Sequence, residues 1–295
     1  MSNTILLIHG AFMTSLYWEN FMDFYERKGF RCLAPSWPYK DKPIDELRRN
    51  PPVELARLGV AEIVNHYAAI IRTLPEPPFL IGHSMGGLVV QMLLDRGFGA
   101  GGVAICSAPP RGVPPIFYWS VIKSSRGLLA PRGWSRVLRL SFKEFQFASV
   151  HTLTESEQRA AYDRYVVPES RRSLWQVATA AFHRATYVNF MNSHRAPLLL
   201  VAADEDLITP AAMNRLNLKR YWHSTASTEF KEFKGRTHWI TLQPGWEEVA
   251  DFIILWLKRL PSARIEHLPP AGMEQLSIST PTGLLQANKS NPILE

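Results

Sequence analysis

The sequence has only two cysteines, Cys32 and Cys106, among its 295 residues. Two are too few for a disulfide scaffold, and they do not form a metal-ligand cluster. Each lies in a short apolar run, so we expect both side chains to be buried, reduced thiols. The scarcity of cysteine therefore excludes a small disulfide-rich domain and a cysteine-based metal centre.

Long hydrophobic runs are also absent. No apolar run approaches the roughly 18 to 20 residues that a membrane-spanning helix needs, and the N-terminus lacks the basic segment and cleavable apolar stretch of a signal peptide. We therefore expect no membrane span and a cytoplasmic location. With 46% apolar and 20% charged residues, the chain has the composition of a globular protein with a large core.

Acidic residues are missing between Asp95 and Glu144, where eight basic residues lie. These eight account for more than the formal net charge of +7. The plain interpretation is a solvated helical face, and the alternative is a surface that attracts substrates bearing a carboxylate or phosphate, or that rests on an anionic surface. Because the excess is confined to one block, we expect no nucleic-acid partner. The eight are Arg96, Arg111, Lys123, Arg126, Arg132, Arg136, Arg139 and Lys143.

Short apolar runs alternate with longer helical patterns along the chain. This alternation predicts the α/β fold class, with a mostly parallel sheet flanked by helices. The expected strands are 4–8, 30–34, 79–82, 103–106, 197–203 and 228–233, and the expected helices are 18–28, 60–74, 86–95 and 246–260.

The alternation stops between residues 108 and 185. This stretch contains aromatic-rich segments broken by proline and glycine, and it is too long for a bare loop in a compact domain. We expect a helical insertion there, between two parts of one core, 1–107 and 186–260. Residues 261–295 are rich in Pro, Ser, Thr and Asn and predict a loosely ordered tail.

The sharpest local signal is the run of residues from Gly82 to Gly87, which reads Gly-His-Ser-Met-Gly-Gly. A Gly-x-Ser-x-Gly pattern is weak alone, but here it lies between an expected strand and an expected helix. A serine on such a sharp turn projects its hydroxyl above the sheet, and glycines on either side avoid collisions with neighbouring backbone. The pattern therefore predicts Ser84 as a nucleophile.

A nucleophilic serine needs a base, and it needs donors for the oxyanion that forms on the carbonyl oxygen. The backbone N–H of Met85 opens the helix after Ser84, and the loop after the first strand offers a second N–H, from Ala11. We expect His9 in that loop to shape it rather than to transfer protons. His238 is the expected base because it follows the last strand through a turn and can fold over Ser84.

The base needs an acid that fixes its tautomer and stabilises the imidazolium. Three acidic residues, Asp204, Glu205 and Asp206, follow the strand 197–203 at the carboxyl edge of the sheet. Asp206 is preferred over Asp204, because residues directly after the strand are committed to the turn while the third is free to reach sideways. Asp204 and a simple solvated turn stay as alternatives.

With these residues in place, the chain resembles the α/β-hydrolase superfamily, in its esterase-like members with a serine nucleophile. The resemblance covers residues 1–110 and 186–260. Its signatures are His9-Gly10-Ala11, the 82–87 turn, the strand-then-acid segment 198–210 and the segment 235–239 around His238. The order Ser, Asp, His is that of the family. The family often has glycine three residues before the acid, where this chain has Ala203.

The resemblance implies a catalytic triad of Ser84, Asp206 and His238, with an oxyanion hole from the N–H groups of Ala11 and Met85. It also implies that the insertion is a cap domain over the site. Aromatic side chains near Ser84 would favour an apolar or aromatic small-molecule substrate. The expected substrate-binding residues are Phe12, Trp119 and Trp239.

These residues predict a cofactor-free and metal-free hydrolase that cleaves a carboxylic ester, thioester or lactone through an acyl-enzyme. Two alternatives stay open: a lyase or perhydrolase that uses the same triad, and a ligand-binding receptor with little turnover.

Overall fold

A single sheet organises the protein. The computed structural model describes residues 3–114, 137–180 and 184–260. The sheet has six strands in the order β2-β1-β3-β4-β7-β8, and every neighbouring pair is parallel. The expected α/β class is therefore confirmed. The strands are β1 (Thr4–Ile8), β2 (Arg31–Leu33), β3 (Phe79–His83), β4 (Gly101–Ile105), β7 (Leu198–Ala203) and β8 (Thr228–Phe233).

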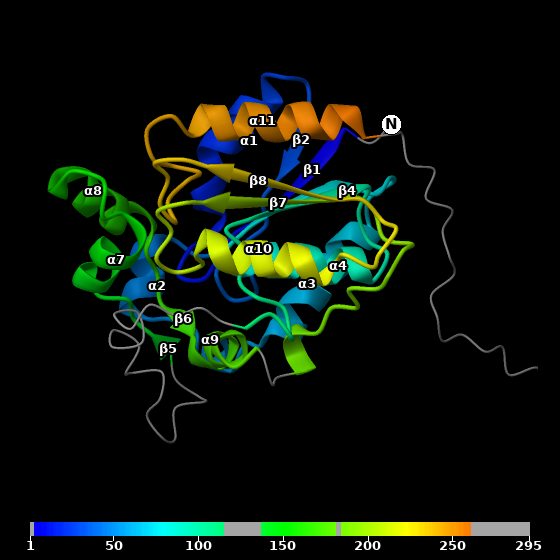
Figure 1. Cartoon of the computed structure of the whole chain (residues 1–295). Helices are drawn as coiled ribbons and strands as arrows, with labels where there is room; N and C mark the ends of the chain where they lie inside the picture. Colours follow the sequence, from blue (N-terminus) through cyan, green and yellow to red (C-terminus); the bar gives the residue numbers. More distant parts are fainter. Residues whose placement is uncertain (1–2, 115–136, 181–183, 261–295) are drawn as a thin grey trace, which may run out of the picture. The chain divides into compact units, whose positions relative to one another are not determined.

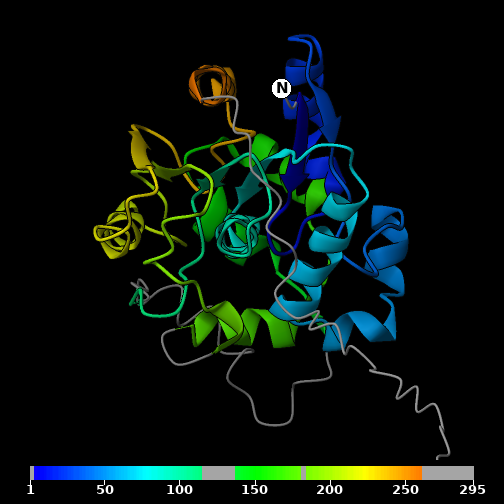
Figure 2. The same cartoon turned by 90° about the vertical axis from the view of Figure 1, so that its right-hand side faces the viewer.

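Helices cover both faces of this sheet (Figures 1 and 2). Helices α1 (Glu19–Glu26) and α11 (Trp246–Arg259) pack on one face, and α3 (Val60–Arg72), α4 (Met85–Asp95) and α10 (Ala211–Arg220) pack on the other. Strand β1 shows how a single strand contributes side chains to the helical layers on both faces of the sheet. Ile5 and Leu7 pack with α1 and α11, whereas Leu6 and Ile8 pack with α3 and α4. Alternate residues of a strand point to opposite faces, so an unbroken apolar run fills two cores.

The segment between β4 and β7 holds several further elements, which are two short strands and several helices. Helices α7 and α8 each begin with a capping box, Ser141 with Glu144 and Thr154 with Glu157. The elements are β5 (Val137–Leu138), α7 (Phe142–Ser149), α8 (Glu155–Tyr165), β6 (Glu169–Ser170), α9 (Arg171–Ala178) and η3 (Arg184–Thr186). The described part of the insertion contains helices, as expected, but the antiparallel pair β5 and β6 was not expected, because two-residue strands are too short to show a period.

The other differences from the expected elements are small. Helix α2 (Ile44–Arg49), the 3-10 turns η1 (Ser15–Trp18) and η2 (Val53–Arg57), and α10 were not anticipated. Both cysteines are buried and free, as expected. No helix within the described part of the chain is long and apolar enough to cross a membrane. The expected tail, 261–295, lies outside the described residues.

The carboxyl ends of the parallel strands meet at one edge of the sheet, and α7 and α8 lie on that side (Figure 1). The predicted site residues all follow strands at this edge: Ala11 follows β1, Ser84 follows β3, Asp206 follows β7 and His238 follows β8. Such an edge is where ligands bind in open α/β sheets. The fold therefore gathers residues that are far apart in the sequence.

Candidate active site

Ser84 occupies a strained turn between β3 and α4. Its backbone has φ 56° and ψ −118°, in a region that few non-glycine residues adopt. Its N–H donates to the carbonyl of Ile105, 2.9 Å away, and α4 begins at the next residue. A Cβ at Gly82 would collide with the carbonyl of Gly86, and a Cβ at Gly86 would collide with the carbonyl of Ile8. The glycines are therefore required for the turn that presents Ser84, as predicted.

The loop after β1 passes directly against Ser84. A Cβ added to Gly10 would lie 2.9 Å from Cβ of Ser84 and 3.1 Å from the carbonyl oxygen of His83. The next residue, Ala11, lines the same cavity as Ser84 and Met85. Met85 is the first residue of α4, where backbone N–H groups have no partner within the helix. Both predicted oxyanion donors therefore belong to backbone beside Ser84.

Asp206 and His238 form a buried pair. Nδ1 of His238 lies 2.7 Å from Oδ2 of Asp206, and the Asp206 side chain is fully buried. Asp204, the alternative acid, instead accepts from the backbone N–H of Arg236 and lies 3.7 Å from Nζ of Lys234. The structure thus brings the preferred acid to the candidate base and directs the alternative elsewhere.

The carboxylate of Asp206 is held in its ionised form by its neighbours. The backbone N–H groups of Ile208 and Thr209 each donate to Oδ1 at 2.8 Å, and the Thr209 hydroxyl lies 2.7 Å from Oδ2. Burial by itself would raise the pKa of Asp206. The charge of His238 and the hydrogen bonds from His238 and Thr209 outweigh burial and lower this pKa to about 2.

This charge state sets the tautomer of His238. An ionised carboxylate only accepts hydrogen bonds, so Nδ1 of His238 carries the proton and Nε2 of the neutral ring keeps its lone pair. His238 and Ser84 line the same cavity. Among the described residues no hydrogen bond joins the Ser84 hydroxyl to His238, and such bonds often tighten only when substrate is bound.

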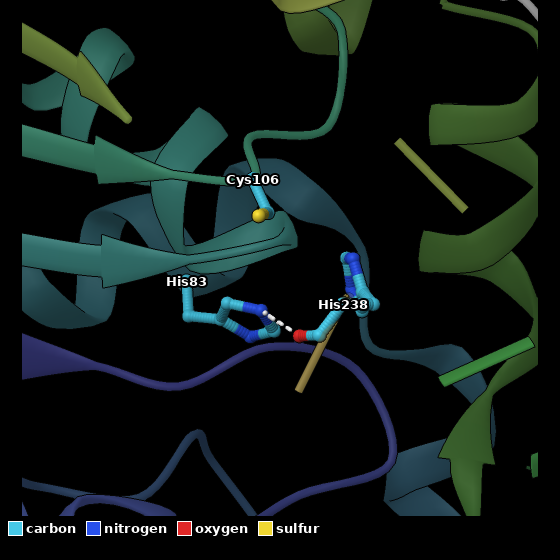
Figure 3. A group of neighbouring side chains, drawn as sticks. All are labelled: His83, Cys106 and His238. Carbon is cyan, nitrogen blue, oxygen red and sulfur yellow. Dashed lines mark hydrogen bonds between the residues drawn. The ribbon is translucent and has the colours of Figure 1, made fainter. Parts of the chain in front are cut away.

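His83 holds the backbone of His238 in place, and this role was not expected from the sequence. Its Nε2 donates to the backbone carbonyl of His238 at 2.9 Å, and the two rings lie 4.6 Å apart (Figure 3). The ring of Tyr17 stacks on His83 at 5.0 Å. Burial, followed by the charge of His238, lowers the pKa of His83 well below its usual value, so His83 is neutral. In the sequence, the feature that could have pointed to His83 was its position directly before Ser84.

The side chains of His83, Cys106 and His238 come close enough to suggest a metal site. Their ligand atoms lie within 4.8 Å of one another (Figure 3). However, one ring nitrogen of each histidine, Nε2 of His83 and Nδ1 of His238, already donates to an oxygen acceptor, which leaves a single nitrogen on each ring. Burial and the neighbouring Asp206 raise the pKa of the Cys106 thiol, whereas a metal ligand must be a thiolate. The cluster therefore fits a support for the Asp206–His238 pair better than a metal centre.

A cavity of about 420 Å³ opens over Ser84 and His238. Phe12 and Trp239, two of the expected substrate contacts, line it, whereas the third, Trp119, lies outside the described residues. Its other walls are mainly apolar and come from both the core and the insertion. They include Met13, Leu138, Leu140, Ala148, Leu174, Val177, Ala178, Ile208 and Met213.

The basic block is only partly described. Lys123, Arg126, Arg132 and Arg136 lie outside the described residues. Arg139 lines the cavity, and its guanidinium donates to the backbone carbonyl of Arg48 at 2.5 Å. One member of the block therefore reaches the candidate site, and steering of anionic substrates stays a prediction.

His9 lies in the loop after β1, and both of its ring nitrogens face backbone groups rather than a group that exchanges protons. Its Nε2 accepts from the backbone N–H of Trp37 at 3.1 Å, its Nδ1 lies 2.8 Å from the carbonyl of Gly10, and Trp37 stacks on its ring. Burial lowers the pKa of His9 well below its usual value. This environment agrees with the expectation that His9 shapes the loop.

Several solved structures are similar to this chain. The monoacylglycerol lipase of Paleococcus ferrophilus has 24% identity and a TM-score of 0.63, with 86% of this chain and 93% of that chain covered. An extracellular α/β-hydrolase from a Paenibacillus species has 18% identity, a TM-score of 0.64 and coverages of 85% and 98%. A pyrethroid hydrolase from Sphingobium faniae has 16% identity, a TM-score of 0.60 and coverages of 88% and 98%. At these identities the likeness shows the fold.

The comparison with curated proteins gives no significant match. A family model described as the alpha/beta hydrolase family matches residues 5–252. This match spans most of the chain, including every strand of the sheet except the first residue of β1, and each predicted catalytic residue. The chain belongs to the alpha/beta hydrolase family.

Proposed function

We propose that this protein is a cofactor-free serine hydrolase that cleaves a carboxylic ester, a thioester or a lactone of an apolar or aromatic substrate. The observation that supports this most directly is the buried Asp206–His238 pair, 2.7 Å apart, on the same cavity as the strained Ser84. Family membership supports hydrolysis in general. The substrate class follows from the apolar cavity walls.

In the proposed reaction, Nε2 of His238 takes the proton of the Ser84 hydroxyl as its oxygen attacks the substrate carbonyl. The N–H groups of Ala11 and Met85 stabilise the oxyanion of the tetrahedral intermediate. His238 then protonates the leaving alcohol, and the acyl-enzyme forms on Ser84. A water molecule, deprotonated by His238, releases the acid. Asp206 stabilises the imidazolium in both steps.

The domain assignment belongs to the same proposal. We assign residues 1–107 and 186–260 to the catalytic core, residues 108–185 to a cap and residues 261–295 to a tail. Leu174 and Val177 of α9 line the cavity together with core residues, which supports a cap that selects the substrate. The two buried free thiols support a reducing, cytoplasmic setting.

A panel of p-nitrophenyl esters of increasing acyl length tests the activity. The wild type is expected to hydrolyse them and Ser84→Ala to lose turnover. Ser149→Ala is the matched control because Ser149 lines the same cavity. No turnover of any ester by the wild type would contradict the proposal. Fluorophosphonate labelling of Ser84 without ester turnover would instead favour the lyase, perhydrolase or receptor alternative.

A further inference from the structure

A buried ion pair lies beside the loop that follows β1. Nζ of Lys40 is 2.6 Å from Oε2 of Glu169, and both side chains are 0% exposed. The cost of removing two charges from water exceeds their attraction unless additional hydrogen bonds complete the pair. Neither residue has a role in the proposed reaction, so the reason for burying them has to be sought in their other contacts.

The carboxylate of Glu169 also holds the backbone of the loop. The N–H of Phe12 donates to Oε2 of Glu169 at 3.0 Å, and the N–H of Ser170 donates to Oε1 at 2.7 Å. The carbonyl of Phe12 accepts from the N–H of Val167 at 2.8 Å. Both peptide groups of Phe12 are thus bound by one segment, Val166–Ser170. Phe12 has φ 63°, a conformation that a non-glycine residue keeps only when its surroundings impose it.

The Val166–Ser170 segment is itself anchored to the core. Nε of Arg48 donates to the carbonyl of Val166 at 2.8 Å, and the Ser170 hydroxyl donates to the carbonyl of Leu58 at 2.6 Å. The ammonium of Lys40 also lies 5.0 Å from the ring centroid of Trp37, whose backbone N–H donates to Nε2 of His9. The loop after β1 is therefore bound to Glu169 and Val167, and the segment that carries these two residues is itself anchored to the core.

The position of the loop decides where the Ala11 N–H points. Gly10, on one side of Ala11, packs against Ser84, while Phe12, on the other side, is bound to Glu169 and Val167. Because the Phe12 N–H is bound to Glu169, it is not available to an oxyanion, which agrees with the assignment of that role to the N–H of Ala11. The positive charge of Lys40 also neutralises Glu169, whose unbalanced charge would oppose negative charge developing nearby.

We propose that Glu169 and Lys40 are positioning residues for the oxyanion hole. This inference rests on the proposed function. Glu169 orients the Ala11 N–H through Phe12, and Lys40 keeps the carboxylate of Glu169 in place and electrically balanced. The Lys40–Glu169 pair affects kcat through stabilisation of the transition state, and neither side chain contacts the substrate.

Three substitutions test this role. Glu169→Asp keeps the charge but shortens the reach to the Phe12 N–H, and Glu169→Gln and Lys40→Met each remove one charge. We expect each to lower kcat about 10- to 100-fold, below the loss for deleting an oxyanion donor, with KM changed less than about 3-fold. The double variant Lys40→Met/Glu169→Gln leaves no unpaired charge and retains an amide oxygen for Phe12. It is expected to recover much of the lost kcat.

The neighbouring exposed pair offers a matched control. Nζ of Lys42 lies 2.6 Å from Oε1 of Glu46, and both side chains are 44% exposed, so Lys42→Met is expected to leave kcat unchanged. Rates are normalised to the sites that a fluorophosphonate titrates, which separates lost folding from lost positioning. If a single-charge variant does not fold, Glu169→Asp and the double variant provide the test.

Wild-type kcat in Glu169→Asp, or a loss that appears in KM alone, would overturn the inference. So would a loss of kcat that disappears after normalisation to titrated sites. Failure of the proposed function is recognised separately, because the wild type itself would then neither react with the fluorophosphonate nor turn over an ester.

Discussion

Nδ1 of His238 lies 2.7 Å from Oδ2 of Asp206, and the backbone N–H groups of Ile208 and Thr209 hold the other carboxylate oxygen. This arrangement leaves Nε2 of His238 as the only ring nitrogen that can accept a proton. It also distinguishes Asp206 from Asp204, which the sequence left as an alternative.

Replacing Asp206 by Asn should lower kcat by about 10³- to 10⁴-fold, because the amide favours the wrong tautomer of His238. Asp204→Asn is the matched control, since Asp204 binds Arg236 and lies near Lys234. It should change kcat less than about 3-fold. Steady-state kinetics with one p-nitrophenyl ester measures both. A larger loss at Asp204 would reverse the assignment of the acid.

Stability should depend on pH through Asp206. Folding lowers the pKa of Asp206 from 3.8 to about 2, so its contribution to stability is present above pH 4 and is lost as the pH falls toward 2. The shift corresponds to roughly 2 kcal/mol. Between pH 6 and pH 2, urea denaturation of the wild type should therefore lose about that much more free energy of unfolding than Asp206→Asn. Equal losses in the two proteins would show that Asp206 is not the group responsible.

The hydroxyl of Thr209 should help to keep the pKa of Asp206 low. Thr209→Val removes the hydroxyl 2.7 Å from Oδ2 of Asp206 but keeps the backbone N–H that binds Oδ1. We expect the pKa of Asp206 to rise and kcat to fall about 10-fold, the effect of about 1.4 kcal/mol. Thr209→Ser restores the hydroxyl and should restore most of kcat. An active Val variant with an inactive Ser variant would contradict this role.

Gly10→Ala should damage catalysis more than folding. The added Cβ would lie 2.9 Å from Cβ of Ser84, so either the loop or Ser84 has to move. A displaced oxyanion donor typically costs about 10²- to 10³-fold in kcat. Gly29→Ala is the control: its φ of +86° is strained for alanine, but no atom beyond its two chain neighbours lies within 4 Å of the added Cβ. It should lower the melting temperature and leave kcat intact. A wild-type kcat in Gly10→Ala would show that the position of this loop does not affect catalysis.

The apolar cavity should set the preferred acyl length. Val177 of α9 and Met213 of α10 line it from the insertion and from the core. Val177→Trp should lower kcat/KM for long-chain esters at least about 10-fold and spare the acetate ester, because lost apolar burial costs about 0.8 kcal/mol for each CH₂. The ratio of the two specificity constants is the measurement. A uniform loss across all chain lengths would argue against this cavity as the acyl site.

The sequence predicted the sheet and the main catalytic candidates because both leave local patterns. Buried parallel strands appear as short apolar runs, and the turn around Ser84 needs glycines at Gly82 and Gly86. Helix α10 was missed because it buries asparagines: Nδ2 of Asn214 binds the carbonyl of Thr209, and Nδ2 of Asn217 binds Gln91. Buried polar residues of this kind interrupt the apolar periodicity by which a helix is recognised in a sequence.

Buried charges were beyond the reach of a sequence pattern. Lys40 and Glu169 are 129 residues apart and look like solvated residues in the sequence, yet both are fully buried. His83 was overlooked for a related reason, since its partner is the backbone carbonyl of His238. Only the three-dimensional fold shows which distant groups complete such hydrogen bonds.

The proposed function depends first on Ser84 acting as the nucleophile, with His238 as its base and Asp206 stabilising the imidazolium. Its most direct test is to treat the wild type with a fluorophosphonate and to locate the adduct by peptide mass spectrometry. We predict one adduct per chain, on Ser84, with labelling abolished in Ser84→Ala and strongly slowed in His238→Ala. An unlabelled Ser84 in the folded wild type, or an adduct on another residue, would contradict the account.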